Sequence, residues 1–370
     1  MNDLYKLDLR KISIVSILFW GRSGTLFMGS LLDSHHSILT IPESVMSNYF
    51  DRDGFWKRNE MKSDYQLMLD AFCEEYSALF AEDFRYGAIK MGEFKAHMEG
   101  FITENEEFSR RSFFIYIHFS YALCLNQDIR RKSLINFQMH DSSVFTRMNE
   151  LLRDFEDAKF IGMYRYPIRA LHSHMRHHKD NINEYLDNGE FSKIYPLYTW
   201  LKKPDDEIDH LIPKSAYSYV DEVIDGQYLR YYTHQLTGWK KAGVQFDLNL
   251  HSVGLESLHD KPHETMESVA DYLQIEFRDS LLKSTFNGIA YTSDKRSIQK
   301  IQGFSSDHTR MTKYQESFNE VDVYVINNIV SLLYPEYHHL KDESLERDSL
   351  IDLLNVPTKT ESLAIEKTFG

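Results

Sequence analysis

The chain of 370 residues is 42% hydrophobic and 14% aromatic, which is enough apolar material for a sizeable core and excludes a disordered chain. Its formal net charge of −14 argues against nucleic acid or an anionic membrane as a partner of the whole surface, but it allows a local basic pocket for a small anion. Because only Cys73 and Cys124 are present, we expect no disulfide framework and a cytoplasmic location.

The first apolar run extends from Ile12 to Trp20. It is too short to cross a membrane and no small-residue cleavage site follows it, so we expect no membrane span. Its β-branched residues favour a strand that is buried on both faces. A short loop with two glycines follows at 21–25, and apolar residues then recur at helical spacing from Leu26 to Leu32, which predicts a helix.

Strands and helices alternate along the rest of the chain. Further strands are predicted over residues 38–41, 86–92, 133–140, 159–165 and 244–250, and helices over 63–84, 107–126, 144–155, 228–241, 262–273, 280–286 and 321–333. This alternation indicates right-handed βαβ units and therefore an α/β fold, a parallel sheet flanked by helices. We expect a single domain over residues 1–340, an irregular helical insertion at 181–222 and a charged tail at 341–370.

The loop Gly21-Arg-Ser-Gly-Thr25 is the first candidate site. Where a strand passes through a glycine loop into a helix, free backbone N–H groups converge and the positive end of the helix dipole favours an anion. Arg22 adds a cation, and Ser23 and Thr25 add hydroxyl groups. A loop for a nucleoside triphosphate needs Gly-Lys-[Ser/Thr] at its end, which this chain lacks. A plain glycine turn stays open as the alternative.

A second candidate follows the predicted strand 159–165. Arg165 ends that strand, Pro167 is suited to the first position of a helix, and Ser173 returns close to the strand end after about two helical turns. A guanidinium group and a hydroxyl group together suit a phosphate monoester. The loop 21–25, His140 and Arg165 all fall at predicted carboxyl ends of parallel strands, where ligands bind in such sheets.

These two motifs together resemble the nucleotide-binding elements of the sulfotransferases that use 3′-phosphoadenosine-5′-phosphosulfate (PAPS). Gly-Arg-Ser-Gly-Thr is similar to the 5′-phosphosulfate loop of the bacterial and tyrosylprotein-like branch. The spacing of eight from Arg165 to Ser173 resembles the 3′-phosphate element. Residues 244–275 also look like the late strand, acidic turn and helix of that family, so the likeness covers most of residues 12–340. It implies a P-loop-like fold that binds PAPS without a metal.

The resemblance implies a role for each matching residue. Arg22 would contact the sulfonate and the leaving 5′-phosphate. The other loop residues would hold that phosphate through N–H and hydroxyl groups: Gly21, Ser23, Gly24, Thr25 and Leu26. Arg165 and Ser173 would hold the 3′-phosphate. A late basic loop, represented loosely by Lys295 and Arg296, would supply a further contact to it.

Two residues compete for the role of general base, because an acceptor hydroxyl is a poor nucleophile until it loses its proton. Glu43 lies 21 positions after Arg22, a spacing similar to that of the catalytic glutamate of tyrosylprotein and several bacterial sulfotransferases. His140 resembles the catalytic histidine of the cytosolic enzymes, but its neighbours Gln-Met-His-Asp depart from their Lys-Thr-His-Leu-Pro. We prefer Glu43, because the segment before it matches better, and His140 stays open.

The predicted function is transfer of a sulfonate from PAPS to a hydroxyl of a carbohydrate or secondary metabolite by in-line displacement, with the insertion covering the acceptor side. The expected partner is a small molecule or glycan, and a homodimer stays open. Two alternatives also stay open, a P-loop kinase and a non-catalytic nucleotide-binding module. We predict no metal site, because the helical pair His174 and His178 has no evident third ligand.

Overall fold

The computed structural model describes most of the first half of the chain and parts of the second. The described residues are 4–19, 23–43, 45–51, 54–60, 64–139, 144–166, 168–170, 172–173, 250–292, 303–305 and the single positions Tyr314, Val323 and Asn327. The chain divides into two compact units, the first made of residues 1–19, 24–164 and 241–305, and the second of 20–23, 165–240 and 306–370.

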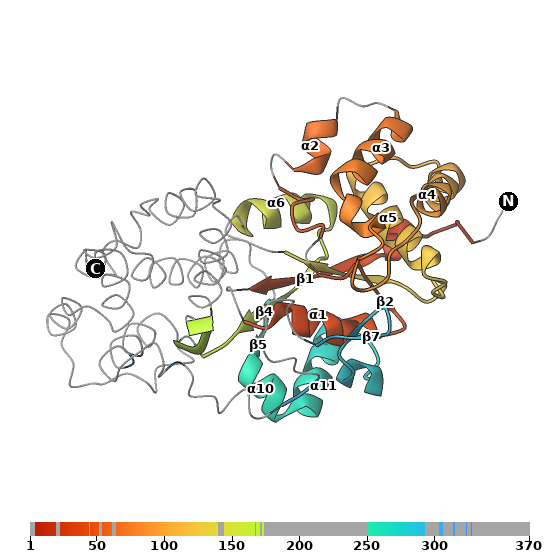
Figure 1. The fold of residues 1–370 in the computed structure, drawn as a ribbon. Coiled ribbons are helices and arrows are strands. Elements are labelled where there is room, and N and C mark those ends of the chain that lie inside the picture. The colour runs from red at the N-terminus through yellow and green to blue at the C-terminus, as the bar shows by residue number, and fades with distance from the viewer. Residues whose placement is uncertain are drawn as a thin grey trace, which may run out of the picture. The chain divides into compact units, whose positions relative to one another are not determined.

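A five-stranded sheet forms the centre of the first unit (Figure 1). Its strands are β1 (Ser13–Phe19), β2 (Ile38–Thr40), β3 (Leu134–Gln138), β4 (Lys159–Tyr164) and β5 (Leu250–Gly254), in the order β2-β3-β1-β4-β5. Every neighbouring pair is parallel. Because β1 is central, the residues that follow it lie at the middle of the edge where parallel sheets bind ligands.

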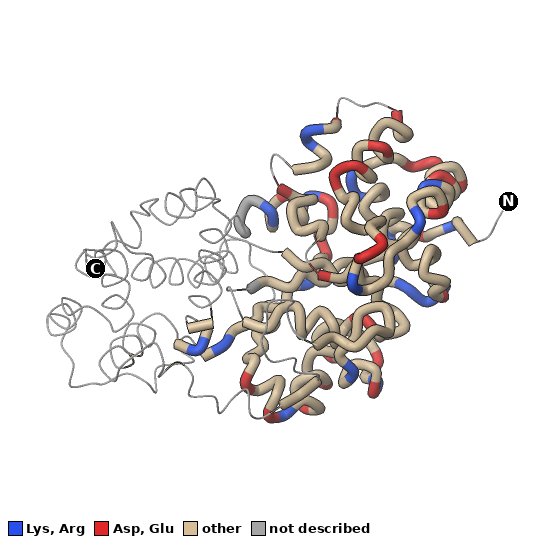
Figure 2. The backbone as a smooth tube through the Cα atoms, in the orientation of Figure 1, with Lys and Arg blue, Asp and Glu red and all other residues tan. Residues whose placement is uncertain are grey.

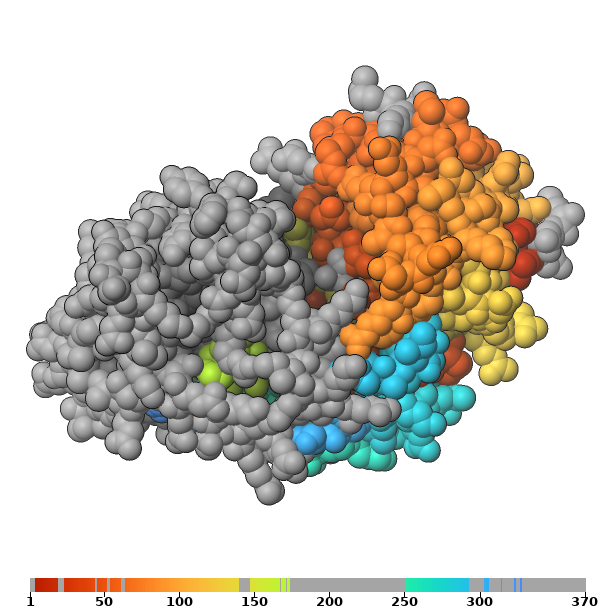
Figure 3. Space-filling view, in the orientation of Figure 1, coloured from red at the N-terminus to blue at the C-terminus, as the bar shows by residue number. Residues whose placement is uncertain are grey.

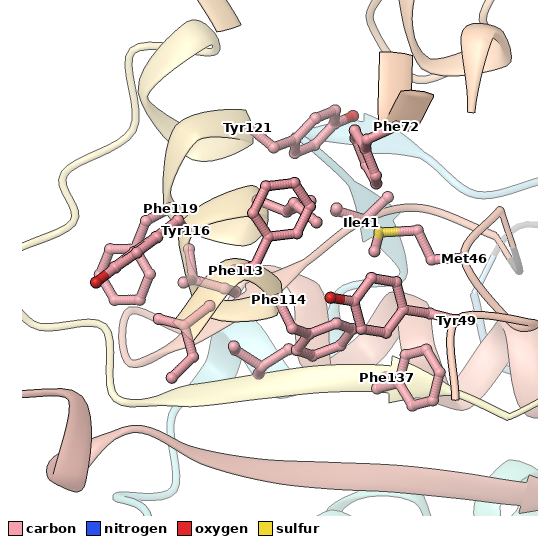
Figure 4. Close-up of a cluster of buried hydrophobic side chains, with 14 of the residues drawn as sticks. Ile41, Met46, Tyr49, Phe72, Phe113, Phe114, Tyr116, Phe119, Tyr121 and Phe137 are labelled. Carbon is pink, nitrogen blue, oxygen red and sulfur yellow. The ribbon is translucent and has the colours of Figure 1, made fainter. Parts of the chain in front are cut away.

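One face of the sheet is covered by helices α2 to α6 (Figure 1). They are α2 (Phe55–Asn59), α3 (Tyr65–Glu75), α4 (Met91–Asn105), α5 (Arg110–Cys124) and α6 (Val144–Asp154), with short 3₁₀ helices at Leu9–Lys11 and Ser77–Phe80. Ser109 and Ser112 form a capping box that begins α5. Phe114 of α5 packs between the rings of Tyr49 and Phe137 in an aromatic core (Figure 4), which fixes this layer on the sheet.

The opposite face carries α1 (Thr25–Asp33), α10 (Leu255–Asp260) and α11 (Pro262–Leu273) (Figure 1). A 3₁₀ helix at Asp279–Leu282 leads into a hairpin of β6 (Thr285–Phe286) and β7 (Ile289–Ala290). Alternate residues of β1 point to the two cores, with Ile14 and Leu18 on the first and Val15 and Ile17 on the second. The strand is therefore buried on both faces, as its sequence predicts.

Among the described residues of the first unit, charged residues lie mainly on the outer helices and loops (Figure 2). The hairpin surface borders the segment around residue 85 (Figure 3), where the Arg85 guanidinium donates to Thr292 Oγ1 at 2.6 Å. Within the described ranges, no helix combines the length and apolar character that a membrane crossing requires.

The second unit is described at few positions. The N–H groups of Arg169 and Ala170 both donate to the carbonyl of Tyr166, at 3.0 and 3.1 Å, and so close the first turn of a helix. The Tyr166 hydroxyl donates to Asn327 Oδ1 at 2.8 Å, and the Arg169 guanidinium lies over the Tyr166 ring. These contacts place a helix start directly after β4, as Pro167 predicts.

The α/β prediction of a parallel sheet flanked by helices is confirmed. The predicted strand at 86–92 is wrong, because Gly87 adopts φ +99° and α4 begins at Met91. The predicted helix at 280–286 is also wrong beyond Leu282, where β6 begins instead. The late strand lies at Leu250–Gly254 rather than ending at Leu250. The insertion at 181–222, the helix at 228–241 and the tail at 341–370 lie outside the described residues.

Candidate functional site

Helix α1 begins with backbone N–H groups that no side chain caps. Gly24 is its N-cap residue, in the left-handed conformation at φ +89°, and makes no side-chain cap hydrogen bond. The Met28 N–H donates to the Gly24 carbonyl at 3.0 Å and closes the first turn. The first turn contains no acidic residue. A helix start of this kind is suited to an anion, because its N–H groups and its dipole both favour negative charge.

Ser23 precedes this turn and is only 1% exposed. Its Oγ has no hydrogen-bond partner among the described residues. Leaving a buried hydroxyl unsatisfied costs about 1–3 kcal/mol. In the described part of the chain, the hydroxyls of Ser13, Ser16, Ser120 and Ser280 are also buried without a partner, but Ser23 is the one that precedes the first turn of α1. A phosphate oxygen would satisfy it, so the residues present fit the 5′-phosphate end of PAPS. Gly21 and Arg22 lie outside the described residues.

The rest of the predicted loop belongs to α1. Thr25 is its first residue and is half-buried. The Leu26 side chain packs against the second core, so any contact of Leu26 with a nucleotide would use its N–H group. Gly24 also faces α10, where an added Cβ would lie 2.5 Å from Leu255 Cδ1. Leu255 therefore occupies the space that a side chain at position 24 would need, so this position favours glycine.

Glu43 follows β2 in a strained conformation. Its φ of +61° lies in the left-handed region, which non-glycine residues seldom adopt and which Glu106, Asn126, Gln274 and Asn287 also adopt in this chain. Thr40 pairs with Asn136 of β3, so Glu43 leaves the carboxyl edge of the sheet. In the order β2-β3-β1, β2 is two strands from β1, about 10 Å.

His140 lies outside the described residues, but the strand before it is described. Met139 continues β3 alongside β1, where its N–H donates to the Ile17 carbonyl at 3.3 Å. His140 therefore follows the strand next to β1, whereas Glu43 follows the one beyond it. Both candidate bases follow strands whose carboxyl ends share one edge.

Arg165 and Ser173 belong to the second unit. Arg165 comes directly after Tyr164, the last residue of β4, and Ser173 lies in the helical segment that begins after Tyr166. The strand, the helix start and the helical position of Ser173 agree with the expectation from the sequence. The shared role of the two side chains on a 3′-phosphate stays a prediction. Lys295 and Arg296 lie outside the described residues.

Two polar residues on β3 were not predicted from the sequence. Asn136 Nδ2 donates to the Gly29 carbonyl of α1 at 3.2 Å. Gln138 occupies the space beside Gly29 where a Cβ would otherwise lie, and its Nε2 has no hydrogen-bond partner in the described part of the chain. Asn136 and Gln138 alternate with the apolar residues Ile135 and Phe137. This alternation could have indicated that the two polar side chains share one face of β3, because residues two apart on a strand point to the same side.

A buried ion pair was also not predicted. The Arg147 side chain in α6 is 8% exposed and donates from Nε and Nη2 to the Asp51 carboxylate. An added Cβ at Gly54 would lie 2.5 Å from the Asn48 carbonyl oxygen, so only glycine allows the tight loop that presents Asp51. The pair links the segment after β2 to the helix after β3, but nothing in its spacing along the sequence indicates it.

At the far end of α1, Asp33 is half-buried beside the β6–β7 hairpin. Its carboxylate accepts a hydrogen bond from the Asn287 N–H at 2.8 Å. Burial raises the pKa of Asp33 to about 7, against the opposing effects of that hydrogen bond and of the Lys132 charge. Asp33 therefore connects the C-terminal end of α1 to the hairpin, at the opposite end of the helix from the predicted phosphate loop.

The described ranges hold no evident metal centre. No group of three or more His, Cys, Asp or Glu side chains there could hold an ion. His172 is buried in the helical segment after Tyr166, and His174 and His178 lie outside the described residues. The prediction of no metal site therefore stays a prediction.

Comparisons with known proteins give likenesses of structure only. No protein-family profile matches the chain, and no curated protein resembles it in sequence. The sulfotransferase domain from the curacin biosynthetic pathway superimposes with a TM-score of 0.41 at 12% identity, over 92% of this chain and 96% of that one. The sulfotransferase domain of the Synechococcus PCC 7002 olefin synthase gives 0.37 at 13%, over 93% and 94%. A Mycobacterium avium sulfotransferase gives 0.35 at 12%, over 75% and 67%. At identities of 12–13% and TM-scores of 0.35–0.41, these likenesses assign no function to this chain.

Proposed function

We propose that this protein transfers a sulfonate group from PAPS to a hydroxyl group of a small-molecule or glycan acceptor. The observation that carries the proposal is the start of α1, where the buried Ser23 hydroxyl has no partner among the described residues and Gly24 leaves the first turn without a side-chain cap. This arrangement follows the central strand of a parallel sheet and suits a phosphate group. The spacing of Arg165 and Ser173 supports a second phosphate at the 3′ position.

The proposed reaction is an in-line displacement at sulfur. The acceptor oxygen forms the new S–O bond, while the bond between sulfur and the bridging oxygen breaks and its electron pair stays on the departing 5′-phosphate. The acceptor proton passes to the general base. Arg22 and the N–H groups of the first turn of α1 stabilise the developing negative charge, a contribution of roughly 3–4 kcal/mol for one preorganised donor.

Glu43 is the preferred base. The preference rests on the segment before Glu43, which matches the resembling enzymes better than the neighbours of His140 do. His140 follows the strand nearer to β1 and is the competing candidate.

The first experiment measures turnover of the purified chain with ³⁵S-labelled PAPS and a panel of hydroxyl acceptors, in parallel with ATP and magnesium. Labelled product supports the sulfotransferase. Magnesium-dependent turnover of ATP would instead favour the kinase. Tight binding of adenosine 3′,5′-bisphosphate without turnover of any acceptor would favour the non-catalytic module.

The second experiment assigns the residues. Arg22→Ala should lower kcat/KM by about 10²–10³. Glu43→Gln removes the basic group at constant volume and should lower kcat by about 10²–10⁴, with His140→Asn as the matched variant. If both variants keep the wild-type rate, neither residue is the base. A larger loss in His140→Asn than in Glu43→Gln reverses our assignment.

A further inference from the structure

The turn between α1 and β2 contains a fully buried histidine. The His35 side chain is 0% exposed, and both nitrogens of its ring have hydrogen-bond partners. Nε2 lies 2.9 Å from the Glu276 carbonyl oxygen, after α11. Nδ1 lies 3.3 Å from the backbone nitrogen of Ser37 and 2.7 Å from its Oγ. The ring therefore joins this turn to a segment that is far away in the sequence.

The partners of His35 fix the position of its single proton. A carbonyl oxygen only accepts hydrogen bonds and a backbone N–H only donates them. The proton therefore lies on Nε2, which donates to Glu276, while Nδ1 accepts from the N–H and the hydroxyl of Ser37. A second proton on Nδ1 would face the Ser37 N–H directly and leave it without this acceptor. Only the neutral ring satisfies all of these contacts.

The groups around His35 also disfavour a positive charge on its ring. The Lys132 ammonium, shortly before β3, donates to the His35 carbonyl oxygen at 3.3 Å. The His36 ring packs beside the His35 ring with centroids 4.4 Å apart, and Arg278 adds a cation from the segment after α11. Burial lowers the pKa of His35 and these three groups lower it further, against the opposing hydrogen bond to Glu276.

Two carboxylates near this ring do not offset that effect as the pH falls. The Glu276 carboxylate accepts from the Arg278 guanidinium at 2.6 Å, which holds the pKa of Glu276 below its usual range, so it stays ionised and paired. Asp33 gains a proton as the pH falls through about 7, which stabilises the folded chain. His36 is half-buried and is the neighbouring group that titrates in the same direction as His35.

The hydrogen bonds of His35 hold an outer segment in place. Residues 275–278 follow α11 as an extended stretch outside helices and strands, and Glu276 is exposed to solvent. On the inner side, the Ser37 carbonyl accepts the N–H group of Ser133 at 3.0 Å, directly before β3. A movement of the His35 ring would therefore detach the outer segment first, because the inner contacts belong to the sheet.

We propose that His35 is an acid-sensitive clasp, which fastens residues 275–278 to the turn between α1 and β2 while it is neutral and releases them when it gains a second proton. The proton comes from solvent and binds at Nδ1, and the charged ring moves into water. An unperturbed imidazole has a pKa of about 6.5. Because the closed ring binds the proton less tightly than the open one, acid favours the open form. The clasp is independent of the proposed function, since none of its groups belongs to the proposed nucleotide site.

Hydrogen exchange of the full-length protein tests the clasp. It is followed by mass spectrometry on peptides from residues 34–41 and 271–279, with the intrinsic exchange rate corrected at each pH. If the open ring titrates near 6.5, opening should be about tenfold more frequent at pH 5.5 than at pH 7.5, and the protection of both peptides should fall by about that factor. Equal protection at the two pH values would overturn the proposal. An equal loss in peptides from β1 and α5 would also overturn it, because the whole unit would then unfold together.

Two substitutions assign the effect to one ring. His35→Gln places an amide nitrogen close to Nε2, keeps the donor for Glu276 and cannot be charged, so the protection of both peptides should be the same at the two pH values. His36→Gln is the matched control and should keep the dependence of wild type. A dependence that survives in His35→Gln, or that disappears in His36→Gln, contradicts the role of His35.

Nitrogen-15 spectra of the histidine-labelled wild-type protein give a result that needs no variant to fold. At pH 7.5, His35 should be the neutral tautomer with its proton on Nε2, as its partners require. A proton on Nδ1, or a ring that is already charged at this pH, would overturn the proposal.

Discussion

Gly24 is required by two separate features of its surroundings. Its φ of +89° is costly for any residue with a Cβ, and that Cβ would lie 2.5 Å from Leu255 Cδ1. We expect Gly24→Ala to lower the free energy of unfolding by about 2–4 kcal/mol, about 1–2 from the backbone and the remainder from overpacking. Urea denaturation measures the loss, and nucleotide binding should weaken with it.

The control is Gly92→Ala. Gly92 lies in α4, and no atom lies within 4 Å of the place that an added Cβ would take. Alanine there should raise the stability by about 0.5–1 kcal/mol through helix propensity alone. Equal effects at positions 24 and 92 would show that neither the conformation nor the contact with Leu255 matters.

Asp33 makes the stability of the protein depend on pH. Burial raises its pKa from 3.8 to about 7, so the folded chain binds this proton more tightly than the unfolded chain does. Its contribution to stability is fully present below about pH 4 and is lost as the pH rises through about 7. The loss by pH 8 is at most about 4 kcal/mol, since one pKa unit corresponds to about 1.4 kcal/mol.

Asp33→Asn tests this dependence. Asparagine carries no charge and keeps a carbonyl oxygen for the Asn287 N–H. We expect the variant to be more stable than wild type at pH 8 and close to it at pH 4, in urea denaturation at both values. The exposed substitution Asp83→Asn is the control and should leave the difference between the two pH values unchanged. A difference at pH 4 as large as that at pH 8 would show that the effect comes from packing and not from charge.

At the scale of elements, α1 approaches β3 closely because Gly29 has no side chain. The Gln138 amide occupies the space that a methyl group at position 29 would take. Gly29→Ala should therefore cost about 1–3 kcal/mol. In a Gln138→Ala background, the same change should gain about 0.5–1 kcal/mol from helix propensity.

A double-mutant cycle measured by urea denaturation gives the coupling between the two positions. Contact between them predicts a coupling free energy of about 1.5–4 kcal/mol, which is the difference between the cost in wild type and the gain in the Gln138→Ala background. Simple additivity of the two single changes would show that the helix does not depend on this contact. Nucleotide binding measured on the same four proteins would show whether the spacing of α1 from the sheet affects the proposed site.

The hairpin of β6 and β7 is not predicted in the sequence analysis, although its turn sequence indicates it. Asn287 and Gly288 adopt φ +51° and +76°, and Asn-Gly between two short strands is the strongest local indication of such a turn. The strand predicted over residues 86–92 is the opposite case, because its sequence suggested a strand that the structure does not contain. Its apolar residues are too few to separate a strand from a buried loop, and Gly87 at φ +99° ends any extended run.

At the scale of the whole molecule, one sheet separates two cores. Phe114 is fully buried in the first core and Leu273 is 3% exposed in the second. Because both cores pack on the same strands, the two faces should unfold together. Phe114→Ala and Leu273→Ala should each destabilise one shared transition, by about 3–5 and 2–5 kcal/mol respectively.

Leu67→Ala is the control for this pair. Leu67 is 53% exposed on α3, so its loss should change stability by about 0.5 kcal/mol or less. Separate transitions for the two core variants, seen by circular dichroism and by tryptophan fluorescence, would show that the layers of the first unit unfold independently.

The parallel α/β fold, the strand before the glycine loop and the helix after it could all be predicted from the amino-acid sequence alone. Long apolar runs and helical periodicity are local properties, and burial in two cores is the only environment that suits them. The motifs around Gly24 and Arg165 are local in the same sense, because each needs only a strand end and the helix that follows.

The tertiary structure alone decided which distant residues meet. Asn136 and Gln138 against Gly29, Arg147 with Asp51, and His259 with Ser305 are contacts between segments far apart in the chain. Such partners carry no shared local pattern, because side-chain packing across elements selects them. The conformation of Glu43 belongs to the same class, since its left-handed backbone is imposed by the fold around it.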